Sequence, residues 1–156
     1  GYTNRNDDFS CFTFQIQTEN REQYLEVYPS LEAVEKAAMK CYDLAVTLGA
    51  SEDLAANARL IAMEFMTNIV DYGFNEAVSE MIALHIQLRE FLILTFYDNA
   101  KEWDLPAKTE QASEFFDLLN AQATPSGRGM QIIYALSSEA SRRRIHQINE
   151  TRFVLA

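Results

Sequence analysis

The chain has 156 residues and is 48% hydrophobic, which suits one globular domain with a substantial core and excludes a disordered segment. Its formal net charge of -10 disfavours a nucleic-acid partner, because an acidic protein repels phosphate backbones. Two cysteines are too few for a disulfide framework, and no apolar run is long enough to cross a bilayer. We therefore expect a cytoplasmic protein with reduced thiols and no membrane partner.

Hydrophobic periodicity divides the chain into strand-like and helix-like stretches after a polar start. Residues 1–10 are expected to form a flexible N-terminal segment and residues 11–156 one domain. Ser30 and Ser51 each precede a run with apolar residues at helical spacing, so both are predicted N-caps. In chain order, the predicted elements are strands at 11–19 and 23–28, helices at 31–48 and 52–73, strands at 81–90 and 91–98, a short helix at 112–122, a helix at 130–136 and strands at 139–147 and 151–155.

The order of these elements indicates the fold class. Helices are grouped early, and several strands follow one another closely enough to pair as hairpins. This arrangement favours an α+β sandwich over alternating βαβ units. Because the chain begins without Met, we also expect that it can be a domain cut from a longer regulator.

The helix predicted over 52–73 carries two polar residues beside its apolar stripe. Glu64 and Asn68 lie one turn apart, and at about 100° per residue they fall next to the row formed by Ile61 and Phe65. A carboxylate so close to a core face has to be solvated, paired or used in chemistry. An ordinary glutamate at a helix edge would show the same pattern, so this motif alone decides nothing.

Two further segments have the composition of a nucleotide site. Asp98 ends a buried strand and can accept a hydrogen bond from a base, although a plain turn after the strand is the simpler interpretation. Gly127 and Gly129 flank Arg128 just before a predicted helix, where free N–H groups, the helix dipole and an arginine suit a phosphate. The order of the three segments is more specific than any one of them.

That order resembles the N, G1 and G2 boxes of the GHKL (Bergerat-fold) ATPases, from about Phe12 to Leu155. The closest likeness is to the anti-sigma-factor serine/threonine protein kinases of the RsbW type, with their E-x-x-x-N, D-x-G-x-x-(aromatic)-D and G-R-G-L motifs. The resemblance implies a two-layer sandwich in which helices cover one face of a mixed, mostly antiparallel sheet. It also implies that the domain binds ATP and Mg2+.

The resemblance assigns a role to each matching residue. Glu64 takes the place of the general base that polarises the attacking hydroxyl, and Asn68 that of the Mg2+ ligand. Asp98 takes the place of the residue that reads the adenine amino group, with Thr151 beside it. The remaining matches are the G1 residues Ala100 and Asp104 and the phosphate-binding residues Gly127, Arg128, Gly129 and Met130, beneath a lid formed by residues 105–126.

The chain departs from the family pattern at Ala100, where glycine is usual, and at Tyr72, where histidine is common. A methyl group at position 100 is expected to weaken nucleotide affinity by crowding the site. Two alternatives therefore stay open beside the kinase. One is a domain that sequesters a partner without catalysis. The other is the catalytic domain of a histidine kinase, although the only histidines, His85 and His146, are in predicted strands, where a packing or surface role is expected.

The predicted partner is a STAS-domain anti-anti-sigma factor, phosphorylated on Ser or Thr. A sigma factor, fused receiver or phosphatase domains and a second copy of the chain are further partners that the resemblance allows. The arginines at 142–144 are in a predicted strand and are expected to lie mostly on a solvated face, where a basic patch for an acidic partner is the alternative.

Overall fold

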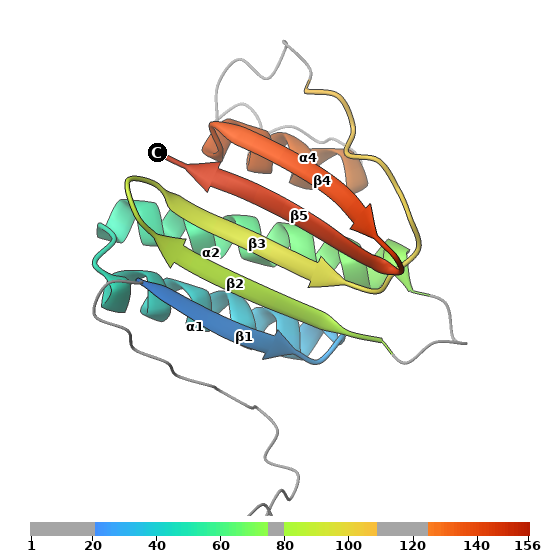
Figure 1. Ribbon diagram of the computed structural model, residues 1–156, viewed down its shortest axis with the longest axis horizontal. Helices are drawn as coiled ribbons and strands as arrows, with labels where there is room; N and C mark the ends of the chain where they lie inside the picture. The colour runs from blue at the N-terminus through green and yellow to red at the C-terminus, as the bar shows by residue number, and fades with distance from the viewer. Residues whose placement is uncertain (1–20, 75–79, 109–124) are drawn as a thin grey trace, which may run out of the picture.

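The computed structural model describes residues 21–74, 80–108 and 125–156 (Figure 1). The flexible segment predicted at 1–10, the strand at 11–19 and the short helix at 112–122 lie outside the described residues. Within the described ranges, no helix is both long enough and apolar enough to cross a bilayer.

The described strands form one sheet. Its described strands follow the order β1-β2-β3-β5-β4, so that β5 lies beside β3 and β4 forms one edge. They are β1 (Glu22–Val27), β2 (Ile82–Leu88), β3 (Leu92–Asp98), β4 (Glu139–Ile145) and β5 (Ile148–Leu155). Every described pairing is antiparallel, whereas the resemblance implied some parallel pairing as well.

Helices cover one face of this sheet, with α2 in contact with both α1 and α4 (Figure 1). They are α1 (Leu31–Leu48), α2 (Glu52–Asn68) and α4 (Pro125–Leu136), and a π-helical turn, η1 (Ile69–Gly73), extends α2. The predicted α+β sandwich with helices on one face is therefore confirmed. The helix expected over 52–73 keeps its limits but changes its winding after Asn68.

Both predicted N-caps are confirmed. Ser30 Oγ accepts the N–H of Ala33 at 3.2 Å, and Ser51 Oγ accepts that of Leu54 at 3.2 Å. Gly49 ends α1 in the left-handed conformation, with a φ of 106° that a side chain would strain. These local signals fix the turn between the first two helices, so that α2 returns across the sheet beside α1.

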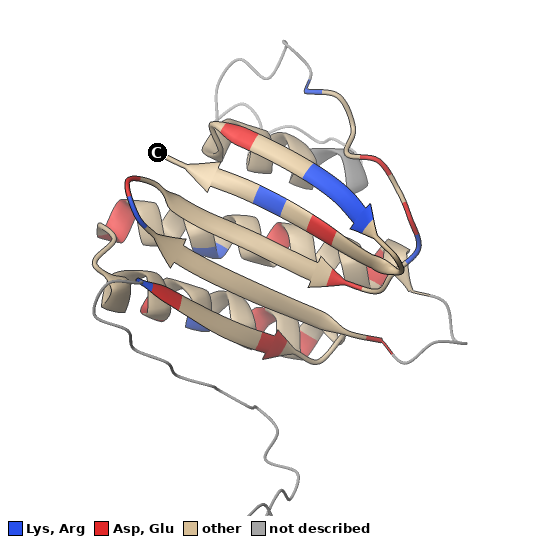
Figure 2. Ribbon diagram, in the orientation of Figure 1, with Lys and Arg blue, Asp and Glu red and all other residues tan. Residues whose placement is uncertain are grey.

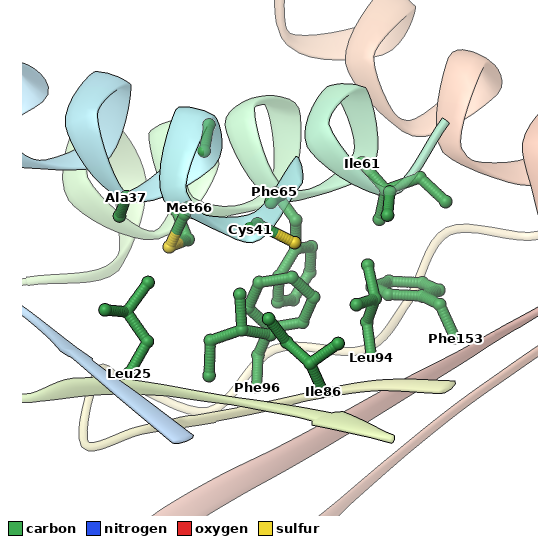
Figure 3. Packing of buried hydrophobic residues seen from close by; sticks show 14 of the residues in the cluster. Leu25, Ala37, Cys41, Ile61, Phe65, Met66, Ile86, Leu94, Phe96 and Phe153 are labelled. Carbon is green, nitrogen blue, oxygen red and sulfur yellow. The ribbon is translucent and has the colours of Figure 1, made fainter. Parts of the chain in front are cut away.

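The core between the helices and the sheet is built around aromatic rings (Figure 3). The ring centroid of Phe65 on α2 lies 4.9 Å from that of Phe96 on β3 and 5.1 Å from that of Phe153 on β5. It also lies 5.9 Å from the ring of Trp103, in the segment after β3. Because the three phenylalanines are fully buried, they hold α2 over β3 and β5 and so fix its neighbouring residue Glu64 at the edge of the core.

Candidate functional site

The end of β3 and the facing positions of β5 and β4 form two rows of polar side chains. In the first row Asp98 faces Asn149, which faces Arg144, and in the second Thr151 faces Arg142. Residues two apart on a strand point to the same face, so both rows lie on the face that the helices cover. Figure 2 shows the resulting charge pattern, a basic band on β4 one strand away from the acidic end of β3.

Asp98 is fully buried, and its two carboxylate oxygens differ in their surroundings. Asn149 Nδ2 donates to Oδ1 at 2.8 Å, and the backbone N–H of Ala100 donates to the same oxygen at 3.0 Å. Oδ2 has no hydrogen-bond partner among the described residues, and Arg142 Nη1 lies 3.9 Å from it. Asp98 therefore keeps one buried acceptor that an amino group could satisfy.

Arg142 fills the space between Asp98, Thr151 and Trp103. Its Nη1 donates to Thr151 Oγ1 at 2.5 Å, and its Nε donates to the carbonyl oxygen of Trp103 at 2.8 Å. The guanidinium also stacks on the Trp103 ring, with its central carbon 4.1 Å from the ring centroid. Both residues expected to read adenine therefore face a guanidinium of the same chain.

Arg144 and Asn149 hold the turn that follows β3. Arg144 Nη1 donates to Oδ1 of Asn149 at 2.7 Å and to the carbonyl oxygen of Ala100 at 3.0 Å. Asn149 Nδ2 donates to the same carbonyl oxygen at 3.0 Å. Because Arg144 occupies the amide oxygen of Asn149, the amide nitrogen is turned toward Asp98 and acts as its donor.

Burial dominates the electrostatics of this end of the site. Burial raises the pKa of Asp98 above its ordinary value, against the lowering effects of the Asn149 hydrogen bond and the Arg142 charge. Burial also lowers the pKa of Arg142, against the attraction of Asp98. At 3.9 Å and without a hydrogen bond, their mutual attraction does not offset the lost solvation of either charge. The pair is therefore incompletely satisfied.

Glu64 and Asn68 meet α4 at Gly129. A Cβ atom placed on Gly129 would lie 2.7 Å from Glu64 Oε2, so the α4 backbone approaches Glu64 more closely than a larger residue allows, and 3.5 Å from Asn68 Nδ2, an ordinary van der Waals contact. The structure thus brings the polar pair of α2 together with the last glycine of the G2 segment. The adjoining cavity, of about 230 Å³, is lined by Asn68, Tyr72, Lys101, Trp103, Pro106 and Met130.

The G2 segment differs from the prediction in where the helix starts. We expected the helix to begin at Met130, whereas α4 begins at Pro125. Proline suits the first turn of a helix, because its fixed φ is already helical and the missing N–H has no partner there. Gly127 and Arg128 are therefore part of α4 and not of a loop before it, while their side chains lie outside the description. Met130 is buried and lines the cavity.

The methyl group of Ala100 is buried against Gly73, at the end of η1. A Cβ atom built on Gly73 would lie 2.8 Å from Cβ of Ala100, so the glycine makes room for the methyl group. Ala100 is absent from the lining of the cavity, and its methyl is accommodated inside the fold. Asp104 is exposed in the segment after β3, and residues 109–124 of the expected lid lie outside the described residues.

Sequence reasoning missed Asn149, Arg142 and Arg144. It expected the three arginines of β4 mostly on a solvated face, but only Arg143 is exposed, and the other two lie against the turn after β3. One signal was available, because Asn149 lies two residues before Thr151 and therefore shares its side of the strand. The arginines could not be placed without the register between β4 and β5.

Comparison with known proteins identifies the family of this chain. No curated protein matches the chain. Among solved structures, the histidine kinase domain of the blue-light activated histidine kinase from Erythrobacter litoralis EL346 is similar at 15% sequence identity and a TM-score of 0.48, over 80% of this chain and 59% of that one. The sequence profile of the histidine kinase-like ATPase domain matches residues 27–155, which include all the described helices and four of the five described strands. The chain therefore belongs to the histidine kinase-like ATPase domain family, of the GHKL type.

Proposed function

We propose that this domain is an ATP-dependent protein serine/threonine kinase that acts as an anti-sigma factor and phosphorylates a STAS-domain antagonist. The observation that carries the proposal is the meeting of Glu64 and Asn68 with the backbone of Gly129, beside a cavity that Asn68 lines. Phosphoryl transfer depends on positioning and charge neutralisation more than on covalent chemistry. A base and a cation ligand beside the N-terminal half of α4 are groups that this reaction can use.

The residues at this end of the site fit ATP with Mg2+. In the part of the chain that the structure describes, no group of three or more His, Cys, Asp or Glu side chains could hold a metal ion. Mg2+ does not need such a group, because it keeps water ligands and binds largely through the phosphates of its substrate. Asn68 would supply the protein ligand through its amide oxygen, and bound Mg2+ would neutralise charge on the phosphates.

The remaining residues would position the two reactants. Glu64 would accept the proton of the attacking Ser or Thr hydroxyl. Asp98 would accept a hydrogen bond from the adenine amino group through Oδ2, the oxygen that has no partner in the described residues, with Thr151 beside it. The start of α4, with Gly127, Arg128, Gly129 and Met130, would lie along the phosphates, and Ala100 and Asp104 belong to the segment that would border the base.

Transfer of labelled phosphate from ATP to a STAS-domain protein tests this proposal. Glu64→Gln is expected to lower the transfer rate about 100- to 10,000-fold, the usual contribution of a general base, while Mg-ATP binding stays unchanged. Glu35→Gln, which removes an exposed carboxylate on α1, is the matched control and should transfer at the wild-type rate. Chelation of Mg2+ by EDTA should stop transfer. A Glu64→Gln variant as fast as wild type would show that Glu64 is not the base.

A second candidate function is partner sequestration without catalysis. The observation that favours it is Arg142, whose guanidinium contacts both residues expected to read adenine. In that case wild type and Glu64→Gln would both leave the STAS protein unlabelled and would bind it with equal affinity in a calorimetric titration. Labelling by wild type alone would exclude this candidate.

A further inference from the structure

We propose that Arg142 is an internal occupant of the base site, and that a nucleotide binds tightly only when its base displaces the guanidinium from Asp98, Thr151 and Trp103. The proposal rests on the proposed function, because it uses Asp98 and Thr151 as the residues that read the base. It adds a residue of β4 that sets nucleotide affinity and has no counterpart in the motifs read from the sequence.

The guanidinium has the shape and the donors of a bound base edge. It is planar and lies on the Trp103 ring at 4.1 Å, as a stacked aromatic ligand would. It presents N–H donors to the hydroxyl of Thr151 at 2.5 Å and toward Asp98 Oδ2 at 3.9 Å. Adenine carries its amino group on such an edge, so Arg142 and adenine compete for the same acceptors.

The contacts of Arg142 also leave it replaceable. Asp98 Oδ2 and Arg142 Nη2 are both buried and have no hydrogen-bond partner among the described residues. A buried polar atom without a partner is costly, so this occupant satisfies the site only in part. An amino group that donates to Oδ2 would supply the missing bond, and Arg142 would regain water as it leaves.

Arg142 has space to move away from the site, and the cavity beside it is too small for a nucleotide unless it moves. β4 pairs only with β5 in the described sheet, so the side of Arg142 away from β5 faces no further strand. The neighbouring cavity of about 230 Å³ is lined by Trp103 but not by Asp98 or Thr151. Ligand sites generally measure about 300–1,000 Å³, so a nucleotide needs more room than this cavity offers. Movement of Arg142 would open the cavity toward Asp98.

The test is calorimetric titration of the domain with Mg-ATP. Arg142→Ala is expected to bind at least about tenfold more tightly than wild type, which corresponds to about 1.4 kcal/mol. Arg143→Ala is the matched control, because this neighbouring arginine is exposed and pairs with Glu150. It should bind like wild type. Trp103 is the only tryptophan of the chain, so its fluorescence should change on titration of wild type with adenosine, which carries no phosphate.

The outcomes separate this proposal from the kinase. Binding by Arg142→Ala that equals or falls below that of wild type, with a cooperative thermal melt, would overturn it. If Arg142→Ala does not fold, Arg142→Lys decides, because it keeps a positive charge near Asp98 without the planar stack, and it must also bind more tightly than wild type. A variant that binds ATP more tightly but transfers no phosphate supports displacement and contradicts the kinase. A variant that transfers phosphate but binds ATP no more tightly than wild type supports the kinase and contradicts displacement.

Discussion

The site has two ends, one open to a cavity and the other filled by a side chain of the same chain. At one end, Glu64 and Asn68 lie against the backbone of Gly129, and Asn68 opens onto a cavity. At the other end, Asp98 is fully buried and Arg142 takes the position of a ligand. The close approach at Gly129 matters because it places the backbone of α4, one turn after the helix begins, against the Glu64 carboxylate and in van der Waals contact with Asn68.

Gly129→Ala tests this close approach. The added methyl would lie 2.7 Å from Glu64 Oε2, a contact that the carboxylate relieves by turning away. We expect phosphoryl transfer to fall at least about tenfold, since a displaced base loses much of its contribution. The free energy of unfolding should change by less than about 1 kcal/mol. The higher helix propensity of alanine over glycine, about 1 kcal/mol, offsets the cost of moving the Glu64 side chain.

Parallel assays of transfer rate and urea unfolding measure the two effects of Gly129→Ala. Ala135→Ser, on the exposed side of α4, serves as the control and should leave the transfer rate unchanged. Normal transfer by Gly129→Ala would show that the position of the Glu64 carboxylate against α4 is not needed for activity.

At the scale of elements, the end of the long helix and the turn after β3 are joined. The N–H of Lys101 donates to the carbonyl oxygen of Gly73 at 2.9 Å, and Ala100 is buried against the same glycine. A π-helical turn at the end of α2 brings Gly73 into this contact. The end of the long helix and the segment after β3 are therefore held together, and the methyl group of Ala100 fits because a glycine faces it.

The Gly73–Ala100 contact predicts a compensating pair of substitutions. Gly73→Ala alone should destabilise the domain by about 1–3 kcal/mol, because its methyl would lie 2.8 Å from that of Ala100. Ala100→Gly in the same chain should recover most of this loss, since it removes the opposing methyl. Urea unfolding of the two single variants and the double variant gives the coupling energy, expected above about 0.5 kcal/mol. Additive effects would show that the two positions relax independently.

The elements that sequence predicted well are those set by signals within a few residues. Ser30 and Ser51 cap their helices as expected, and Glu64 and Asn68 lie on one side of α2 because helical spacing requires it. The roles of Arg142 and Asn149 depend instead on the register of β4 against β5 and of β5 against β3. Register is a long-range property, and a shift of one residue would have turned Arg143 inward in place of its neighbours.

At the scale of the whole molecule, the two faces of the sheet differ. Described helices cover one face, and no described helix covers the other (Figure 1). On that second face the ring of Tyr24 on β1 stacks on the ring of His85 on β2, with centroids 4.0 Å apart. His85 Nε2 also lies 3.0 Å from Glu22 Oε2. These contacts attach the edge strand β1 and leave His85 only 8% exposed.

The attachment of β1 predicts how stability depends on pH. Burial lowers the pKa of His85 from its ordinary value of 6.5, against the hydrogen bond and the charge of Glu22, which raise it. Between the folded and the unfolded pKa of His85, the unfolded chain therefore binds more protons than the folded chain. The stability that comes from keeping His85 neutral is complete above pH 6.5 and is lost as pH falls through the folded pKa. His85→Gln, which does not titrate, should show a flatter dependence of unfolding free energy on pH below 6.5 than wild type.

Urea unfolding at several pH values measures this dependence, and His146→Asn supplies the matched control. His146 is exposed in the β4–β5 turn with a φ of 54°, a conformation that asparagine tolerates. Its curve should run parallel to that of wild type. The comparison between proteins is decisive because the 23 acidic residues of the chain also titrate as pH falls and contribute to every curve. If the curve of His85→Gln also ran parallel to that of wild type, protonation of His85 would not change the free energy of unfolding, and the prediction would be wrong.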